Sequence, residues 1–175
     1  MMRRLVLFGL VMLTLAYAVG VPLFLEREDD PMPSTADAVV VLSGGSDKRL
    51  TTAEAIVGGG IAQNLVISAN RGDRGSRRTR PCRTKTADVI CVYPGPFSTV
   101  DEEEAISQVA ERRNWDTVVI VTSRYNLFRA ERMFRRCGNF RIVEVGVDEP
   151  WWRVAIDVPL EWVKLGVSET VRRGC

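Results

Sequence analysis

Apolar residues in this chain form short runs that are separated by polar, charged or glycine-rich segments. The clearest run, Val118 to Val121, consists of four consecutive residues with branched side chains. Four residues are too few for a buried helix, and an unbroken run is typical of a parallel strand covered on both faces. A polar turn from Thr122 to Asn126 follows, and then a helical segment that carries Phe128 and Met133. This pattern predicts half of a βαβ unit.

The same alternation continues through most of the chain. We expect further strands at 38–42, 65–68, 88–93 and 141–147, and helices at about 48–58, from Ser98 and Thr99 onward, and over most of 151–173, where Pro159 should break or restart the helix. Alternating strands and helices predict a parallel sheet with right-handed crossovers. We therefore predict an α/β fold, a Rossmann-like sheet of about five strands over 37–175, with a strand order that the sequence leaves open.

The first 25 residues lie outside the predicted domain. The run from Leu5 to Leu25 is uncharged and would span roughly 30 Å as a helix, about one bilayer core. Two arginines precede it and four acidic residues follow it within 26–30. By the positive-inside rule, the N-terminus is then cytoplasmic and the domain extracytoplasmic. The sequence predicts a single-pass anchor in the cell membrane, followed by an extended linker at 26–36.

A cleaved signal peptide is the alternative interpretation of this segment. Ala16-Tyr17-Ala18 has the small-x-small pattern of a cleavage site, which would make the protein secreted. We favour the anchor because the apolar character continues past Ala18 as far as Phe24. Both interpretations export the domain.

Charge and composition narrow the classes of function. Without Arg3 and Arg4, the chain contains as many basic as acidic residues, so nucleic-acid binding is not expected. Positive charge is concentrated in a stretch at 70–86 that also contains Gly, Ser and Pro. We predict that this basic stretch is a loop. The chain has no histidine, and its cysteine spacings do not fit a zinc site. We therefore expect neither a metal ion nor another cofactor.

Four cysteines in an exported domain permit two disulfides, with three possible pairings. We favour Cys82–Cys91, which would close a short loop, together with Cys137–Cys175, which would hold the C-terminus.

Polar residues follow three of the predicted elements, at the sheet edge where parallel sheets bind ligands. The candidate ligand-binding residues are Ser43, Gly44, Gly45 and Arg49 after the first strand, Ser98 and Thr99 at a helix start, and Thr122, Ser123, Asn126 and Arg129 after the fourth strand. Glycine turns and helix N-termini bind anions, and arginine binds phosphate bidentately. We expect an anionic, phosphorylated ligand at this edge.

Each candidate also has a purely structural interpretation. The glycine turn could be only a turn, Arg129 could form a surface ion pair, and the basic loop could be a solvated segment. Glu102 could be a catalytic base, but Thr99-x-x-Glu102 also forms a capping box, which is the interpretation we favour. Trp151, Trp152 and Trp162 could serve packing or lie near the membrane surface.

Three motifs together resemble the YdcF-like (SanA/ElyC/YdcF) family. They are Asp37-Ala-Val-Val-Val-Leu-Ser-Gly-Gly45 with Arg49, Pro96-Phe-Ser-Thr99-x-x-Glu102, and Val119-Ile-Val-Thr-Ser-Arg-Tyr-Asn-Leu-Phe-Arg129-Ala130. The cysteine positions are similar to those of actinobacterial members. The resemblance implies a Rossmann-like domain, often membrane-anchored and outward-facing. Some members of the family are linked to cell-wall assembly, lipid-carrier metabolism or vancomycin tolerance, and one branch binds S-adenosylmethionine.

The chain departs from that family at two places. Asn126 stands where members have histidine, and Ser68-Ala69-Asn70 stands where they have Ser-Gly-Gly. Asparagine can hydrogen-bond a ligand, but it cannot transfer a proton near neutral pH. Without any histidine, Ser-His and Cys-His pairs are excluded.

From these observations we expect an envelope protein that binds an anionic cell-wall precursor or lipid carrier without turnover. An active enzyme of phosphate-ester or pyrophosphate chemistry is the alternative, with Glu102 handling protons and Glu103 or Asp47 as other candidates. A nucleotide or S-adenosylmethionine binder is a third, disfavoured because those ligands are scarce outside the cell.

Overall fold

The protein folds around one sheet of five parallel strands in the order β3-β2-β1-β4-β5, which confirms the predicted α/β class. The computed structural model describes residues 2–69, 79–83, 88–94 and 99–170. The strands are β1 (Ala38–Val41), β2 (Asn64–Ser68), β3 (Val89–Val92), β4 (Thr117–Ser123) and β5 (Arg141–Val147). The helices are α1 (Met2–Leu25), α2 (Lys48–Gly58), α3 (Thr99–Arg113), α4 (Leu127–Cys137) and α5 (Trp151–Thr170), with 3-10 turns η3 (Pro81–Arg83) and η4 (Arg124–Asn126).

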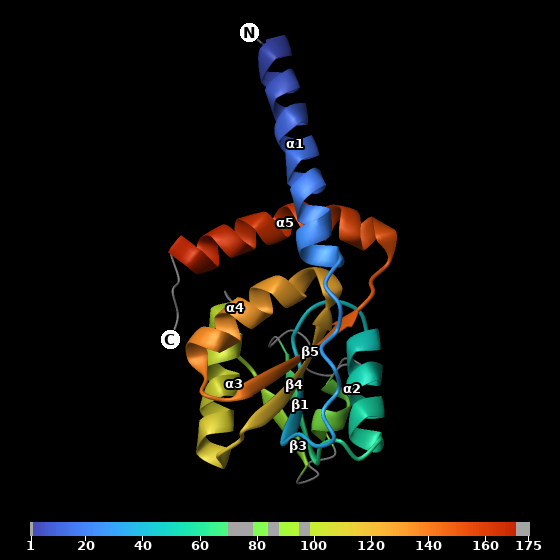
Figure 1. Ribbon diagram of the computed structural model, residues 1–175, viewed down its shortest axis with the longest axis vertical. Helices are drawn as coiled ribbons and strands as arrows, with labels where there is room; N and C mark the ends of the chain where they lie inside the picture. Colours follow the sequence, from blue (N-terminus) through green and yellow to red (C-terminus); the bar gives the residue numbers. More distant parts are fainter. Residues whose placement is uncertain (1, 70–78, 84–87, 95–98, 171–175) are drawn as a thin grey trace.

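The sheet is covered on both faces, as the unbroken apolar runs predict. Val118 and Ile120 of β4 pack with Ala130 and Phe134 of α4, whereas Val119 of the same strand faces the layer that contains α2. Helices α3 and α4 therefore cover one face and α2 covers the other (Figure 1). Because consecutive side chains of a strand point to opposite faces, every residue of the run has to be apolar.

Helix α5 lies across the end of the sheet at which the strands terminate, and α1 extends away from this end of the domain (Figure 1). α1 is long and apolar enough to cross a membrane, and fits either an anchor or a signal sequence. Its C-terminal half packs against α5: the indole Nε1 of Trp162 donates to the Ala16 carbonyl at 3.0 Å. Phe24 is fully buried, with its ring 5.1 Å from that of Trp162 and 6.0 Å from that of Phe128. The last turns of α1 are thus part of the domain's packing.

The prediction that Pro159 breaks the last helix is wrong, because α5 runs through it. A proline lacks the N–H that would bond the carbonyl four residues earlier, here that of Ala155. The hydroxyl of Tyr17 in α1 donates to this carbonyl instead. The contact between the two helices therefore satisfies a group that proline would otherwise leave without a partner.

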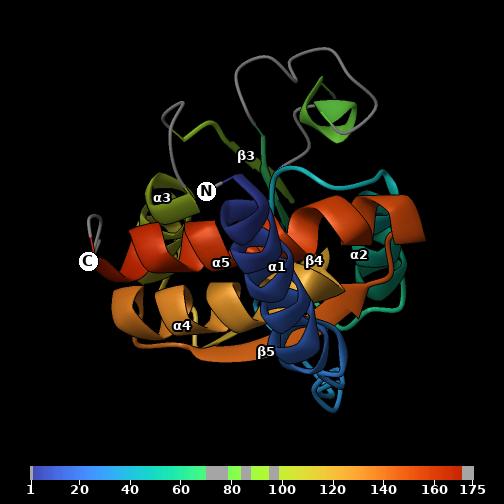
Figure 2. The ribbon, with the colours of Figure 1, turned by 90° about the horizontal axis from the view of Figure 1, so that it is seen from above.

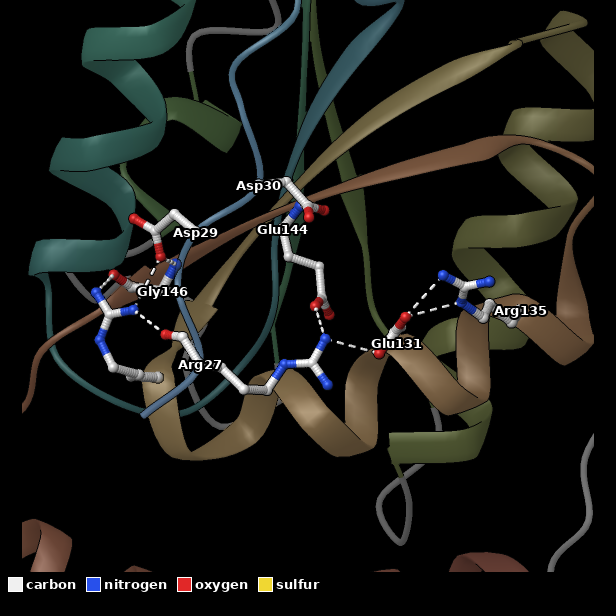
Figure 3. Close-up of polar contacts among 8 residues, drawn as sticks. Arg27, Asp29, Asp30, Glu131, Arg135, Glu144 and Gly146 are labelled. Carbon is white, nitrogen blue, oxygen red and sulfur yellow. Dashed lines mark hydrogen bonds and ion pairs between the residues drawn. The ribbon is translucent and has the colours of Figure 1, made fainter. Parts of the chain in front are cut away.

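The segment at 26–36 is more than a linker, because it binds the outer edge of β5 (Figure 3). The amide of Asp30 donates to the Glu144 carbonyl at 3.0 Å, and the Asp30 carboxylate accepts from the Glu144 amide at 2.9 Å. The Asp29 carboxylate accepts from the Gly146 amide at 2.9 Å. We call residues 27–30 the strap. By pairing with an edge strand, the strap satisfies backbone groups that could otherwise recruit another chain.

Arg27 of the strap joins two carboxylates of the domain. Its guanidinium contacts Glu131 at 2.7 Å and Glu144 at 2.9 Å. Burial raises the pKa of Glu144 to about 7, with Glu131 and Asp30 adding to the rise and Arg27 opposing it. Burial also acts to raise the pKa of Glu131, but hydrogen bonds from Arg27 and Arg135 outweigh this effect and lower the pKa of Glu131.

Glu144 makes the stability of the protein depend on pH. Between the ordinary pKa of 4.5 and the folded value of about 7, the folded state keeps a proton that the unfolded chain has lost. The protein therefore loses stability as pH rises through this window, by up to about 3 kcal/mol, and the loss is complete above it. Glu144→Gln should remove this loss. Thermal unfolding of both proteins in detergent at pH 5, 6, 7 and 8 measures it. Glu111→Gln, which replaces an exposed carboxylate of α3, is the control and should lose stability with pH as the parent does. Parallel curves for the parent and Glu144→Gln would contradict the assignment.

The disulfide Cys82–Cys91 is present, with Cα atoms 5.9 Å apart, and confirms that half of the predicted pairing. It links η3 to β3. Cys175 lies outside the described residues, so Cys137–Cys175 stays a prediction. Most of the basic stretch at 70–86 also lies outside the described part of the chain.

Candidate functional site

A pocket of about 300 Å³ lies at the ends of β1 and β4, beneath α5. Seven of the predicted residues line it: Ser43, Gly44, Gly45, Arg49, Glu102, Asn126 and Arg129. Five more come from the segments after β4 and from α5: Tyr125, Arg153, Asp157, Glu161 and Lys164. The structure thus brings Gly44 and Arg129 to one site, although they come from different βα units.

The turn after β1 depends on two consecutive glycines. Gly44 and Gly45 have φ angles of +81° and +63°, in the left-handed region that side chains disfavour. At Gly44 an added Cβ would meet nothing within 4 Å. At Gly45 it would lie 2.3 Å from Nε of Arg49. The second glycine is therefore needed both for the turn and for the close approach of this guanidinium.

Arg49 connects the end of β1 to the end of β4 by hydrogen bonds. It is buried, and its guanidinium donates to the carbonyls of Leu42 and Ser43 at 3.2 and 2.8 Å. Two of its nitrogens also donate to the Ser123 hydroxyl, at 3.1 and 2.6 Å. That hydroxyl in turn donates to Glu149 at 2.7 Å. Arg49 thus forms one wall of the pocket and holds β1 against β4, whereas Ser123 supports the wall without lining the pocket.

The two glycines offer a matched pair of substitutions. Gly44→Ala should cost roughly 1 kcal/mol, because alanine is strained in the left-handed region. Gly45→Ala bears the same strain and must also displace Arg49 from four hydrogen bonds, so its cost should be at least about twice as large. Thermal unfolding of the two variants in detergent compares them. Equal shifts in Tm would show that the contact between residue 45 and Arg49 contributes nothing.

Glu102 binds the turn after β1, a contact that the capping-box interpretation did not predict. One carboxylate oxygen accepts the Ser43 amide at 2.5 Å, and the other accepts the Ser43 hydroxyl at 3.2 Å. The carboxylate is buried and draws the start of α3 toward the end of β1. Thr99 begins α3, but its side chain and the whole of Ser98 lie outside the described residues.

After β4, a buried polar chain runs from Thr122 to α5. The amide nitrogen of Asn126 donates to the Thr122 hydroxyl at 2.9 Å, and its oxygen accepts from Arg129 at 2.5 Å. Arg129 also donates to Glu161 of α5 at 2.8 Å. The predicted turn is in part strand, since Thr122 and Ser123 belong to β4. Arg129 is therefore no surface residue: it joins α4 to α5 at the floor of the pocket.

The polar side of α5 was missed in the sequence analysis. Arg153, Asp157, Glu161 and Lys164 recur at spacings of four, four and three residues, which places them on one face of a helix. All four line the pocket, and Lys164 donates to Glu161 at 2.8 Å. This spacing was the signal available in the sequence. The expected break at Pro159 hid it, because it divided the helix in two.

Two acidic groups at or near the pocket have raised pKa values. Burial, with a further contribution from Asp157, raises the pKa of Tyr125 to about 12, although a hydrogen bond with Ser123 acts in the opposite direction. The hydroxyl of Tyr125 therefore stays protonated at neutral pH. Glu103 is completely buried and has no hydrogen-bond partner within the described parts of the chain. Burial and the neighbouring Glu102 raise its pKa well above the ordinary value, against a lowering contribution from Arg129. This shift favours the neutral form of Glu103, which is next in the chain to the pocket residue Glu102.

The pocket has a modest excess of positive charge. Its lining contains four cations, Arg49, Arg129, Arg153 and Lys164, and three carboxylates, Glu102, Asp157 and Glu161. The two arginines from α2 and α4 are buried and hydrogen-bonded within the protein. Arg153 and Lys164 of α5 are more exposed, and Lys164 donates to Glu161. Within the described ranges, no group of three or more His, Cys, Asp or Glu residues could hold a metal ion.

Comparison with known proteins identifies no family. No family model and no curated protein matches the chain, so membership of the YdcF-like family stays a prediction. Among solved structures, the chain is similar to the U34-tRNA thiolase NcsA from Methanococcus maripaludis with its [4Fe-4S] cluster. The sequence identity is 13% and the TM-score 0.41, over 88% of this chain and 65% of that one. The chain thus spans about two thirds of that protein's length, and a likeness of this degree supports no inference about function.

Proposed function

We propose that this protein is an outward-facing, membrane-anchored member of the YdcF-like family that binds a phosphorylated cell-wall precursor or lipid carrier without turnover. The observation that carries the proposal is the pocket at the ends of β1 and β4, where cations from α2, α4 and α5 converge. Parallel sheets bind ligands at this edge, and arginine and lysine are the usual partners of phosphate.

The pocket's donors fit a small phosphate-bearing group. Arg153 and Lys164 supply charge from above, and the Tyr125 hydroxyl and the Gly44 turn supply neutral donors from below. A volume of about 300 Å³ lies at the lower limit for ligand sites, so it suits a phosphate or sugar-phosphate head better than a dinucleotide. A larger ligand would therefore extend out of the pocket, as the tail of a lipid carrier would.

The packing of α1 supports retention of the N-terminal segment as an anchor. Cleavage after Ala18 would remove the Ala16 carbonyl that accepts from Trp162 and the Tyr17 hydroxyl that donates to α5. The carbonyl of Ala155 would then lose its partner on α1. A signal peptide has no need of such contacts with the mature domain.

Titration of the full chain in detergent with inorganic pyrophosphate tests the proposal. Arg153→Gln and Lys164→Gln are the variants of choice, because both residues line the pocket and are more exposed than Arg49 and Arg129, although Lys164 also donates to Glu161. Each lost charge-assisted hydrogen bond is worth about 1.5–3 kcal/mol, so each variant should bind roughly tenfold or more weakly by calorimetry.

Arg112→Gln is the matched control, since Arg112 is an exposed cation of α3 and does not line the pocket. It should bind pyrophosphate like the parent. An equal loss in all three variants would indicate attraction by net charge alone. Unchanged binding in the two pocket variants would remove the pocket from the proposal.

A catalytic role is the second candidate, favoured by the pair formed by Ser43 and Glu102. The Ser43 hydroxyl donates to the Glu102 carboxylate at 3.2 Å and faces the pocket, as a nucleophile next to its base would. Phosphatase and pyrophosphatase assays of the parent, Ser43→Ala and Asn126→His separate the candidates. Turnover by the parent that Ser43→Ala abolishes would establish an enzyme. Turnover only in Asn126→His would indicate a binder descended from one.

A further inference from the structure

Helix α5 carries a stripe of exposed apolar side chains. Trp152, Ile156, Leu160, Val163 and Val167 are each between 45% and 63% exposed. Their spacings of four, four, three and four residues place them on one face of the helix. An exposed apolar stripe of this length is unusual for a surface in contact only with water.

The stripe faces away from the domain. On other sides of the same helix, Val158, Glu161 and Ser168 are buried, and Arg153 and Asp157 line the pocket. α5 lies across the top of the domain, and α1 extends from that side at a steep angle to it (Figures 1 and 2). The apolar stripe and the candidate membrane span thus lie on one side of the molecule.

The length of α1 fixes how far α5 must lie from the bilayer. Helix α1 is hydrogen-bonded to α5 at Ala16 and Tyr17, and the charged Arg3 and Arg4 mark the other end of its apolar run, so only Leu5–Leu15 lies between them. About 11 helical residues cover roughly 17 Å, well short of the roughly 30 Å of a hydrocarbon core. α1 can span a bilayer only if its contact region with α5 also lies within the membrane boundary.

We propose that the apolar stripe of α5 is embedded in the interface of the membrane that α1 spans, so that α5 lies flat in the surface as an amphipathic helix. Such helices bury their apolar face about 5–10 Å into the boundary between headgroups and acyl chains, which supplies much of the depth that the apolar run of α1 lacks. Trp151 and Trp152 stand at the start of α5, and tryptophan is enriched at this level of a membrane.

This placement sets the depth of the pocket. The pocket lies on the side of α5 that faces the domain, about one helix diameter below the stripe, and therefore at the level of the lipid headgroups. The inference rests on the membrane anchor in the proposed function, and it specifies the ligand of that function more closely. A phosphate on a membrane-embedded tail would enter the pocket without leaving the bilayer.

Fluorescence quenching by brominated lipids tests the embedding of α5. The full chain is reconstituted in vesicles of phosphatidylcholine and phosphatidylglycerol, with the phosphatidylcholine brominated near either the carbonyl or the methyl end of its acyl chains. Membrane binding alone would be uninformative, because α1 supplies it. The readout is the difference in emission between the parent and Trp151→Phe/Trp152→Phe, which isolates two exposed tryptophans at little cost to folding.

We expect the shallow bromines to quench this difference signal about twofold and the deep bromines to quench it less, with little effect of acrylamide in the water. Strong quenching by acrylamide and none by lipid would place α5 in water and overturn the proposal. Protection from both quenchers would indicate a protein partner or a second copy on the stripe, and would overturn it as well. Because no ligand is added, this test can fail while the pyrophosphate test succeeds, and the reverse.

Discussion

Replacing Arg129 by methionine should lower the free energy of unfolding by about 3–5 kcal/mol, because it leaves the Glu161 carboxylate in a buried site without its main partner. Both side chains are buried, and their contact measures 2.8 Å. For a chain of this size the loss corresponds to a drop in Tm of roughly 6–20 °C, measurable by circular dichroism of the full chain in detergent.

The double variant Arg129→Met/Glu161→Met separates charge from packing. Removing both charges of a buried pair is often neutral, so the double variant should regain most of the lost stability. Lys164, the other partner of Glu161, remains at the surface end of this network. A double variant as unstable as Arg129→Met would show that the arginine contributes through packing against its neighbours and not through the ion pair.

Phe24→Ala should cost about 3–5 kcal/mol, the usual cost of deleting a buried aromatic ring. Phe24 is fully buried among α1, α4 and α5, with edge-to-face contacts to Phe128 and Trp162. The cavity would loosen α1 from the domain at the point where the strap begins. The measurement is thermal unfolding of the full chain by near-ultraviolet circular dichroism in detergent.

Phe8→Ala is the matched control, since Phe8 lies in the same helix and is largely exposed. Its effect on Tm should stay within the error of the experiment in detergent. Similar Tm values for Phe24→Ala and Phe8→Ala would mean that α1 is only tethered to the domain. That result would weaken the inference, drawn from the length of α1, that α5 lies in the membrane interface.

The sheet could be predicted from the sequence because its signal is local. In Val118 to Val121 every residue is apolar, which is required only where both faces are covered, and the structure shows that covering. The strand order could not be predicted, because the same runs suit several orders. The edge of the sheet that binds ligands followed from connectivity alone, and Gly44 and Arg129 do meet there.

What escaped prediction depends on contacts between distant segments. Glu102 sits where a capping box would use it, yet its carboxylate reaches Ser43, which lies 59 positions earlier in the chain. The sequence predicts that Pro159 breaks or restarts a helix, but the Tyr17 hydroxyl binds the Ala155 carbonyl that proline leaves without a partner. Local propensity describes only the cost of such a residue, and the partner that offsets it appears only in the folded structure.

The proposed function depends most on recognition of a phosphate in the pocket beneath α5. The most direct measurement compares two lipids with the same short polyprenyl tail, one ending in a phosphate and the other in a hydroxyl, titrated against the full chain in vesicles. Two or more charge-assisted hydrogen bonds to the pocket cations predict a Kd for the phosphate at least about 100-fold lower. Equal Kd values for the two lipids would show that only the tail is bound, and would contradict the central claim.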